Sequence, residues 1–402
     1  MNRRLAAAGL LLMLTVFLSG CWDQLQIEER GLVLGLAIDP APPDSEAHEI
    51  KSTHLSENLP KRMLKVTAQI AVPGRVPLGP GSGSEGGSKN QNPVWVVSVV
   101  GRTLDDCMNN LQQKIADPRY LVHLRVIVIS KEIAREGFDE LNDYFRRNPE
   151  IRRTTWLLVA EGPAIEFMTV APPLQRVPTL YLLAMLEKAV DSGKFPQDYL
   201  GSFWSAESKW GQDGFLPYVS IRSNENILIN GLAYFRDGRM AGTTLPLDIG
   251  AFMAVQGMEP GGYSVLFKVP GLGQVMAQTT ERYASKTTSV SGGKPSVTCK
   301  LRLEAVIEEH YGGDQPVDST SRLKEISAAL DRVAHRDIMA LIRKTQQEGS
   351  DIFGIGELFR SRHPAYWRAN VHSPEDWSHI YRELPVKLDV HYSIRRVGLK
   401  AK

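Results

Sequence analysis

The chain has 402 residues, of which 43% are hydrophobic and 23% are charged, values that are ordinary for globular protein. Its 47 lysines and arginines nearly balance 45 aspartates and glutamates. This balance argues against a nucleic-acid partner and against polybasic attachment to lipid. The length is sufficient for two or three domains.

The first 20 residues carry the parts of a bacterial export signal. Arg3 and Arg4 form a positive start, and an uncharged apolar run follows over Leu5–Phe17. That run is shorter than the roughly 20 apolar residues that a permanent transmembrane helix needs. Removing both arginines with the signal leaves 45 basic and 45 acidic residues, so the mature chain is formally neutral.

The tetrapeptide that follows, Leu18-Ser19-Gly20-Cys21, resembles the lipobox of bacterial lipoproteins. In such proteins the cysteine thiol receives a diacylglyceryl group, cleavage makes the cysteine the new N-terminus, and its amino group is acylated. A single acyl chain gives only marginal membrane binding, so more than one chain is needed for a stable anchor. We therefore expect residues 1–20 to be a cleaved signal peptide and Cys21 to carry S-diacylglycerol and an N-linked acyl chain such as palmitate. The alternative is an ordinary secretory signal in which Cys21 is incidental.

Residues 21–223 alternate between strand and helix patterns. We predict strands at Gly31–Asp39, Met63–Val72, Val94–Val100, Leu124–Ile129, Thr154–Ala160 and Leu216–Ile221. Helices are predicted after Thr103, which is a typical N-cap, and over Ile133–Arg147, Pro163–Val170, Thr179–Val190 and Gln197–Lys209. Residues 73–93 are rich in Gly, Ser and Pro, which predicts a flexible loop. The G-x-G-x-x-G match at Gly81–Gly86 in this loop lacks the flanking strand and helix that a nucleotide site needs.

Residues 224–402 begin with a hairpin signal, because Asp237-Gly238 separates two apolar runs, Ile227–Phe235 and Arg239–Leu245. Helices are predicted at Leu247–Met258, from Asp318 to about Gln347, and over Asp351–Arg360. Strands are predicted at Ser264–Val269, Gln274–Ser289, Val297–Val306 and Val386–Tyr392. The apolar side of the long helix is too short for sustained heptads, so we expect it to pack on its own sheet rather than in a coiled coil.

Two cysteines remain in the mature chain, Cys107 and Cys299. Helical spacing puts Cys107 on the buried stripe of its helix, and strand alternation points Cys299 inward. An extracytoplasmic protein could oxidise such thiols. We expect both to be small apolar core residues instead.

No pattern for catalysis or metal binding stands out in the sequence. H-E-x-x-H, Walker P-loop and G-x-S-x-G sequences are absent. His363, His372 and His379 lie nine and seven residues apart, without the close-spaced ligand pairs of zinc sites. Asp105-Asp106 falls in a first helical turn, where negative charge complements the helix dipole, although an acid–base pair stays open from sequence alone. We expect neither a cofactor nor a metal.

Together the elements predict a mixed α/β (α+β) fold of two to three consecutive domains, each a mixed sheet flanked by helices. We place an N-terminal α/β region at 21–223, which could comprise two subdomains, and a C-terminal α/β domain at 224–402.

Several stretches, taken in order, resemble the Ger(x)C proteins, the lipoprotein C subunits of spore germinant receptors. Gly20–Asp23 and Gly31–Asp39 resemble the start of these proteins, His123–Ser130 their central strand, and Arg146–Thr154 with Trp156–Gly162 the segment after it. Gly231–Phe235 fits the start of their second half. Asp351–Glu357, Trp367, Trp377 and the closing strand through Gly398 resemble their C-terminal end.

The resemblance implies a non-enzymatic subunit, lipidated at Cys21, that works with an A-type and a B-type membrane subunit in a sporulating bacterium. Its location would be the extracytoplasmic face of the spore inner membrane, where the receptor answers nutrients and starts germination. The family offers no ligand-binding residue that can be carried over. One alternative is a lipoprotein that captures a solute for a membrane transporter, and another is an exported hydrolase that uses scattered carboxylates.

Overall fold

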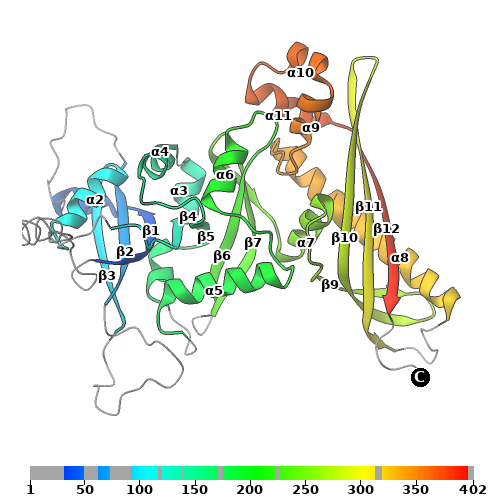
Figure 1. Cartoon of the computed structure of the whole chain (residues 1–402), viewed down its shortest axis with the longest axis horizontal. Helices are drawn as coiled ribbons and strands as arrows, with labels where there is room; N and C mark the ends of the chain where they lie inside the picture. Colours follow the sequence, from blue (N-terminus) through cyan, green and yellow to red (C-terminus); the bar gives the residue numbers. More distant parts are fainter. Residues whose placement is uncertain are drawn as a thin grey trace, which may run out of the picture.

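The computed structural model describes residues 31–48, 62–72, 92–115, 120–137, 139–170, 175–222, 226–312 and 319–396. The signal peptide, Cys21 and the G-x-G-x-x-G match lie outside these residues, as does nearly all of the loop predicted over 73–93. Figure 1 shows an elongated molecule with one sheet towards each end and helix α7 between them.

The larger sheet has eight strands in the order β3-β2-β1-β4-β5-β6-β7-β8. Its centre is parallel, because β1, β4, β5 and β6 run in the same direction, and antiparallel strands extend it on both sides. The central strands are buried on both faces, as their unbroken apolar runs predict. The strands are β1 (Val33–Pro40), β2 (Leu64–Ala71), β3 (Val94–Gly101), β4 (Val126–Ser130), β5 (Trp156–Ala160), β6 (Phe215–Arg222), β7 (Asn226–Arg236) and β8 (Arg239–Thr243).

Helices cover both faces of this sheet, so it carries two separate layers of core. One face packs against α2 (Leu104–Gln112), α3 (Lys131–Glu136), α4 (Asp139–Arg147) and α6 (Leu200–Glu207). The other packs against the 3-10 helix η3 (Ala164–Met168), α5 (Pro178–Asp191) and α7 (Pro246–Gln256). A second 3-10 helix, η2 (Pro43–His48), follows β1. Thr103 is the N-cap of α2, as predicted, and its side chain accepts a hydrogen bond from the N–H of Asp106.

The single helix predicted over Ile133–Arg147 is wrong in one respect, because the structure divides it into α3 and α4. Gly137 separates them and has a φ of 99°. A residue with a side chain rarely adopts that conformation, whereas glycine does so readily. The apolar spacing continues across the break, so spacing alone gave no signal for it.

The smaller sheet has four strands in the order β12-β11-β10-β9. Its centre is a long hairpin that turns at Gly292 and Gly293, both with positive φ. Helix α8 (Thr320–Glu348) packs on one face, and Ser327 Oγ donates to the carbonyl of Tyr392 at 2.6 Å. The prediction that this helix packs on its own sheet is therefore confirmed. The strands are β9 (Ser264–Val269), β10 (Gly273–Ser291), β11 (Lys294–Tyr311) and β12 (Val386–Arg396).

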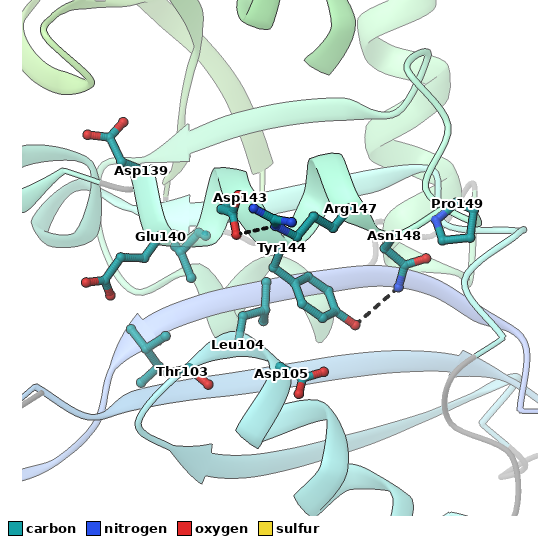
Figure 2. A pocket seen from close by; sticks show the side chains of 12 residues that line it. Thr103, Leu104, Asp105, Asp139, Glu140, Asp143, Tyr144, Arg147, Asn148 and Pro149 are labelled. Carbon is teal, nitrogen blue, oxygen red and sulfur yellow. Dashed lines mark hydrogen bonds and ion pairs between the residues drawn. The ribbon is translucent and has the colours of Figure 1, made fainter. Parts of the chain in front are cut away.

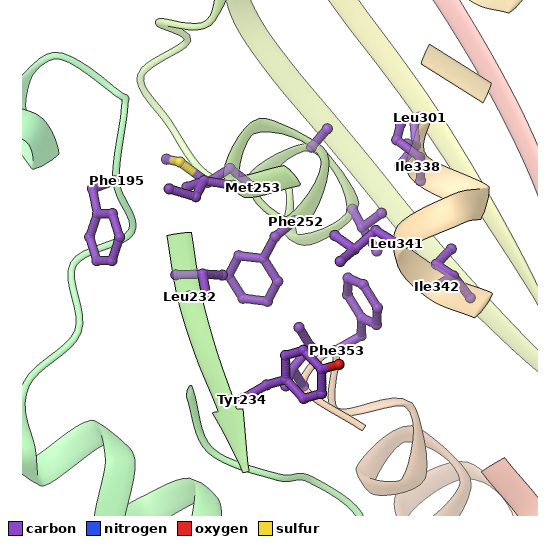
Figure 3. Close-up of a cluster of buried hydrophobic side chains, with 14 of the residues drawn as sticks. Phe195, Leu232, Tyr234, Phe252, Met253, Leu301, Ile338, Leu341, Ile342 and Phe353 are labelled. Carbon is purple, nitrogen blue, oxygen red and sulfur yellow. The ribbon is translucent and has the colours of Figure 1, made fainter. Parts of the chain in front are cut away.

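The two sheets share one continuous apolar core. Figure 3 shows Phe252 and Met253 of α7 between Leu232 and Tyr234 of the large sheet and Leu341 of α8. Arg282 of β10 adds a polar link, because its guanidinium donates to the carbonyls of Met258, Pro260 and Gly193. The small sheet and α8 are therefore packed, through α7, against the large sheet.

The predicted mixed α/β class is confirmed by two mixed sheets with covering helices. The division at 223/224 stays a prediction. The two strands that follow it, β7 and β8, complete the large sheet rather than the small one. Among the described residues, no helix combines the length and the apolar character needed to cross a bilayer.

Candidate functional site

The predicted lipid attachment site, Cys21, lies outside the described residues, and its modification stays a prediction. The described chain begins at Gly31. The carbonyl of Leu32 accepts a hydrogen bond from the N–H of Ala71 at 2.9 Å, which fixes the chain to the end of β2. A tether through Cys21 would therefore join the body at the amino end of β1.

A cleft of about 850 Å³ lies between α2 and α4, on the sheet face that α2, α3, α4 and α6 cover. Leu64, which lines it, pairs with Pro40 at the opposite, carboxyl end of β1. The floor of the cleft contains the buried side chains of Leu64, Leu104 and Leu141. Figure 2 shows Asp139, Glu140 and Asp143 along the α4 side, with Thr103 and Asp105 on the α2 side. Tyr144 also lines the cleft, and its hydroxyl accepts a hydrogen bond from Asn148 Nδ2 at 3.3 Å.

The rim of this α2–α4 cleft is acidic. Asp143 pairs with Arg147 at 2.7 Å, and this hydrogen bond holds the pKa of Asp143 below its usual range. Two helix N-termini add about half a positive charge each, which only partly offsets the four carboxylates. The cleft therefore suits a group with positive charge and some apolar surface. The two residues Asp105 and Asp106 do not act as a pair, because Asp106 is buried and accepts from the N–H of Arg102 while Asp105 faces solvent.

The segment Asp351–Glu357, which the sequence predicted as the first part of a helix, has another role. Helix α9 begins only at Ile355 (Ile355–Arg362), and Asp351 lies in the loop before it. The Asp351 carboxylate accepts hydrogen bonds from the N–H of Gly356 at 2.8 Å and from Trp377 Nε1 at 3.1 Å. Trp377 belongs to α11 (Pro374–Glu383), which follows α10 (Pro364–Asn370). Asp351 therefore organises the loop and helices of the C-terminal end.

The same segment packs closely against the loop before β6. Gly211 and Gly356 approach so closely that a Cβ on Gly356 would lie 2.5 Å from the Cα of Gly211. The N–H of Glu357 donates to the carbonyl of Gly211, and the N–H of Gly211 donates to the Glu357 carboxylate. We call the contact between 210–214 and 350–357 the glycine junction. The sequence predicted residues 351–357 as part of a helix and as a family resemblance but did not predict this contact, for which the glycines at 354 and 356 were the available signal.

Carboxyl groups buried at the glycine junction have raised pKa values. Burial raises the pKa of Asp351 to about 6, partly offset by its hydrogen bonds and by Lys286. Burial also raises the pKa of Asp213 well above its usual value, and the nearby Glu207 carboxylate adds to the shift. One oxygen of Asp351 has no hydrogen-bond partner among the described residues. The junction is therefore sensitive to the protonation of its carboxyl groups.

The carboxyl ends of the parallel strands, a common ligand position in α/β folds, are filled by the protein itself. Asp39, at the end of β1, accepts hydrogen bonds from the N–H groups of Ala164 (2.6 Å) and Ile165 (2.9 Å). These are the groups at the start of η3 that would otherwise face an anion. A small cavity of about 260 Å³ remains beside them.

The histidines and cysteines do not form a ligand set in the structure. Within the described ranges, no three His, Cys, Asp or Glu side chains gather in a way that could hold a metal ion. His363 instead contacts the Thr288 carbonyl at the edge of β10. Cys107 and Cys299 are both buried, and neither forms a disulfide within the described residues, which confirms the prediction of two core thiols.

The described fold defines a class of two-sheet, mixed α/β proteins. The crystal structure of the GerBC protein shares it, with a TM-score of 0.57 at 18% identity over 86% of this chain and 99% of that one. At that identity the likeness concerns the fold alone.

Sequence comparison then places the chain in a family. The family model for the spore germination protein N-terminal domain matches residues 23–221, and the model described as spore germination B3/GerAC-like, C-terminal, matches 230–398. YfkR of Bacillus subtilis (strain 168) is 24% identical over 409 residues, covering 99% of this chain and 98% of that protein. Spore germination protein B3 of the same organism is 24% identical over 396 residues, covering 96% of each. The chain belongs to the Ger(x)C family of spore germination proteins, and the resemblance drawn from its sequence is confirmed.

Proposed function

We propose that the chain is a lipid-anchored, non-enzymatic C subunit of a nutrient germinant receptor, held at the extracytoplasmic face of the spore inner membrane. The observation that carries the proposal is the succession of two spore germination models over residues 23–221 and 230–398, directly after a lipobox. The two models account for nearly all of the mature chain.

The anchor in this proposal is Cys21, joined to Gly31 by the nine residues 22–30. A diacylglyceryl thioether and an N-acyl chain together give the more than one chain that stable membrane attachment needs. The formally neutral mature chain fits this arrangement, because the lipid rather than a general surplus of positive charge would hold it.

The partners in this proposal are an A-type and a B-type receptor subunit. A tagged copy, extracted from spore inner membranes in mild detergent, should bring down both subunits. The Cys21→Ala variant should leave the membrane fraction and reduce the germination response to nutrients. Retention of the variant in the membrane together with a normal response would contradict the proposal.

The solute-binding alternative makes a different demand on the structure. Solute capture calls for an enclosed pocket, most often between domains. The α2–α4 cleft lies within the N-terminal region and has an acidic rim. Calorimetric titration of the purified chain with nutrient amino acids and sugars separates the two: tight binding without partner subunits would favour the solute-binding role.

A further inference from the structure

The length of chain outside the structure limits how far one part of the body can lie from a membrane that holds Cys21. Nine residues lie between Cys21 and Gly31, so the two are ten residue steps apart, and a fully extended chain of that length spans at most about 35 Å. Leu32 is bonded to Ala71, and Ala71 pairs with Val94 on the edge strand β3. The amino end of β1 and the neighbouring ends of β2 and β3 are therefore held near the anchor. We call this region the tethered end.

An open apolar cleft of about 620 Å³ lies at the tethered end. Val72, Val94, Val96, Met168 and Pro178 line it, together with the polar residues Asn92, Thr169 and Arg176. Trp95 also borders it and is 47% exposed, which is unusual for the largest apolar side chain. Strand alternation directs Trp95 to the face of β3 opposite that of Val94 and Val96, so apolar groups are presented around the whole end of this edge strand.

One exposed arginine lies on this cleft, and three more precede the neighbouring parallel strands. Arg176 lies on the cleft, and Arg125 precedes β4 with its N–H bonded to the carbonyl of Leu34. Arg152 and Arg153 precede β5, the next parallel strand. All four are exposed, and no carboxylate in the described part of the chain forms an ion pair with them. At the opposite ends of the sheet, by contrast, Arg222 pairs with Glu161 and Arg62 with Glu136.

We propose that the tethered end rests on the anionic phospholipid surface beside the anchor, with Trp95 at the level of the headgroups and Arg125 and Arg176 on their phosphates. Tryptophan favours the membrane–water interface, and exposed arginines there are attracted to anionic lipid. This orientation rests on the proposed lipid anchor at Cys21 and adds to it a second, non-covalent contact that fixes which face of the subunit meets the membrane. The acidic α2–α4 cleft then remains available to protein partners.

A peptide strand added to the free edge of β3 is the competing occupant, because edge strands readily accept another strand. Strand addition uses backbone groups and gives no role to unpaired arginines. The combination of the short tether, the half-exposed indole and four arginines that form no ion pair within the described part of the chain favours lipid.

The test uses the full chain purified from membranes and reconstituted in vesicles of phosphatidylcholine and phosphatidylglycerol, with or without bromine on the acyl chains. Bromine quenches tryptophan emission only within the bilayer. Trp22, next to the anchor, is first changed to Phe to remove its signal. We expect Trp95→Phe to abolish the bromine-sensitive part of the emission. The matched control is Trp210→Phe, because Trp210 is 48% exposed but lies at the glycine junction, and it should leave that part unchanged.

A second pair of variants tests the arginines. Arg125→Glu combined with Arg176→Glu should weaken the quenching of Trp95, and high salt should do the same in the unchanged chain. Reversal of two exposed arginines on α8, Arg332→Glu with Arg343→Glu, should have no effect. Flotation with the vesicles reports the anchor separately from the orientation.

Three results would overturn the proposal. If the chain floats with the vesicles but Trp95→Phe and Trp210→Phe reduce the bromine-sensitive emission equally, the anchor stands and the orientation is wrong. If Trp95 becomes shielded only when partner subunits are added, the tethered end is a strand-addition site. If the chain does not float at all, the anchor fails and the orientation fails with it.

Discussion

The Asp213 carboxylate accepts a hydrogen bond of 2.6 Å from the backbone N–H of Asp351, and the N–H of Asp213 donates to the carbonyl of Asp351 at 3.0 Å. This reciprocal pair joins residues 138 positions apart in the sequence. It connects the loop before β6 to the loop before α9 and thereby holds the C-terminal helices against the large sheet. Asp351 is fully buried and Asp213 is partly buried, so the packing of the two loops depends on the protonation of these carboxyl groups.

Asp351→Asn should remove the loss of unfolding free energy that the buried Asp351 carboxyl causes as pH rises. The folded-state pKa of Asp351, about 6, is above the unfolded value, so the folded chain binds more protons and loses stability as pH rises between these two values. From pH 4.5 to pH 7.5, the wild type should lose roughly 2 kcal/mol of unfolding free energy relative to the variant. The pKa of Asp213 is also raised, but Asp213 is present in both proteins, so its own titration largely cancels in the comparison. Urea unfolding of both proteins at the two pH values measures it, and parallel pH profiles would contradict the account.

Gly356→Ala should destabilise the protein because its Cβ would lie 2.5 Å from both Gly211 and the Trp377 ring. Overpacking of this kind costs roughly 1–3 kcal/mol, and here backbone stands on one side of the clash. Gly162→Ala is the matched control, since a Cβ at Gly162 meets nothing within 4 Å. Thermal unfolding compares the two variants. An equal melting temperature for both would show that the structure accommodates the added Cβ at Gly356 without losing stability.

Arg282→Lys should weaken the link between β10 and the segments it contacts. The guanidinium is 2% exposed and donates to three carbonyls, a geometry that a single ammonium group does not reproduce. Leaving buried carbonyls unpaired costs about 1–3 kcal/mol. Arg302→Lys, on the adjacent strand β11, changes an exposed ion pair and should cost less than about 1 kcal/mol. Denaturant midpoints for the two variants provide the comparison, and equal shifts would refute the assigned role of Arg282.

The number of thiols that can be titrated depends on whether Cys21 carries the proposed lipid. Cys107 and Cys299 are fully buried, and burial also raises the pKa of the Cys299 thiol. A thiol reagent should therefore react slowly with the native protein, because the thiolate is the reactive form. After denaturation it should titrate two thiols per chain if Cys21 is a thioether, and three if Cys21 is unmodified.

Local patterns in the sequence predicted most individual elements. The Asp237-Gly238 hairpin, the long helix α8 and the inward-facing cysteines follow from turn chemistry and periodicity, which act over a few residues. Gly137 shows the limit of this reasoning, because helical spacing continued across a residue whose φ ends the helix.

The arrangement of these elements depended on contacts between distant residues. Nothing local indicated that β7 and β8 would join the first sheet, that Asp351 would cap a loop rather than begin a helix, or that α2 and α4 would enclose a cleft. The exposure of Trp95 likewise depends on β3 being an edge strand, which is a property of the whole sheet. Family resemblance supplied what periodicity could not, namely the order of the segments across both halves.

Mass spectrometry of the N-terminal peptide from protein isolated from spore inner membranes tests the central claim most directly. We predict a peptide that begins at Cys21 and carries a diacylglyceryl thioether with an acylated amino group. A peptide that continues into Gly20, or that has a free thiol at Cys21, would contradict the account.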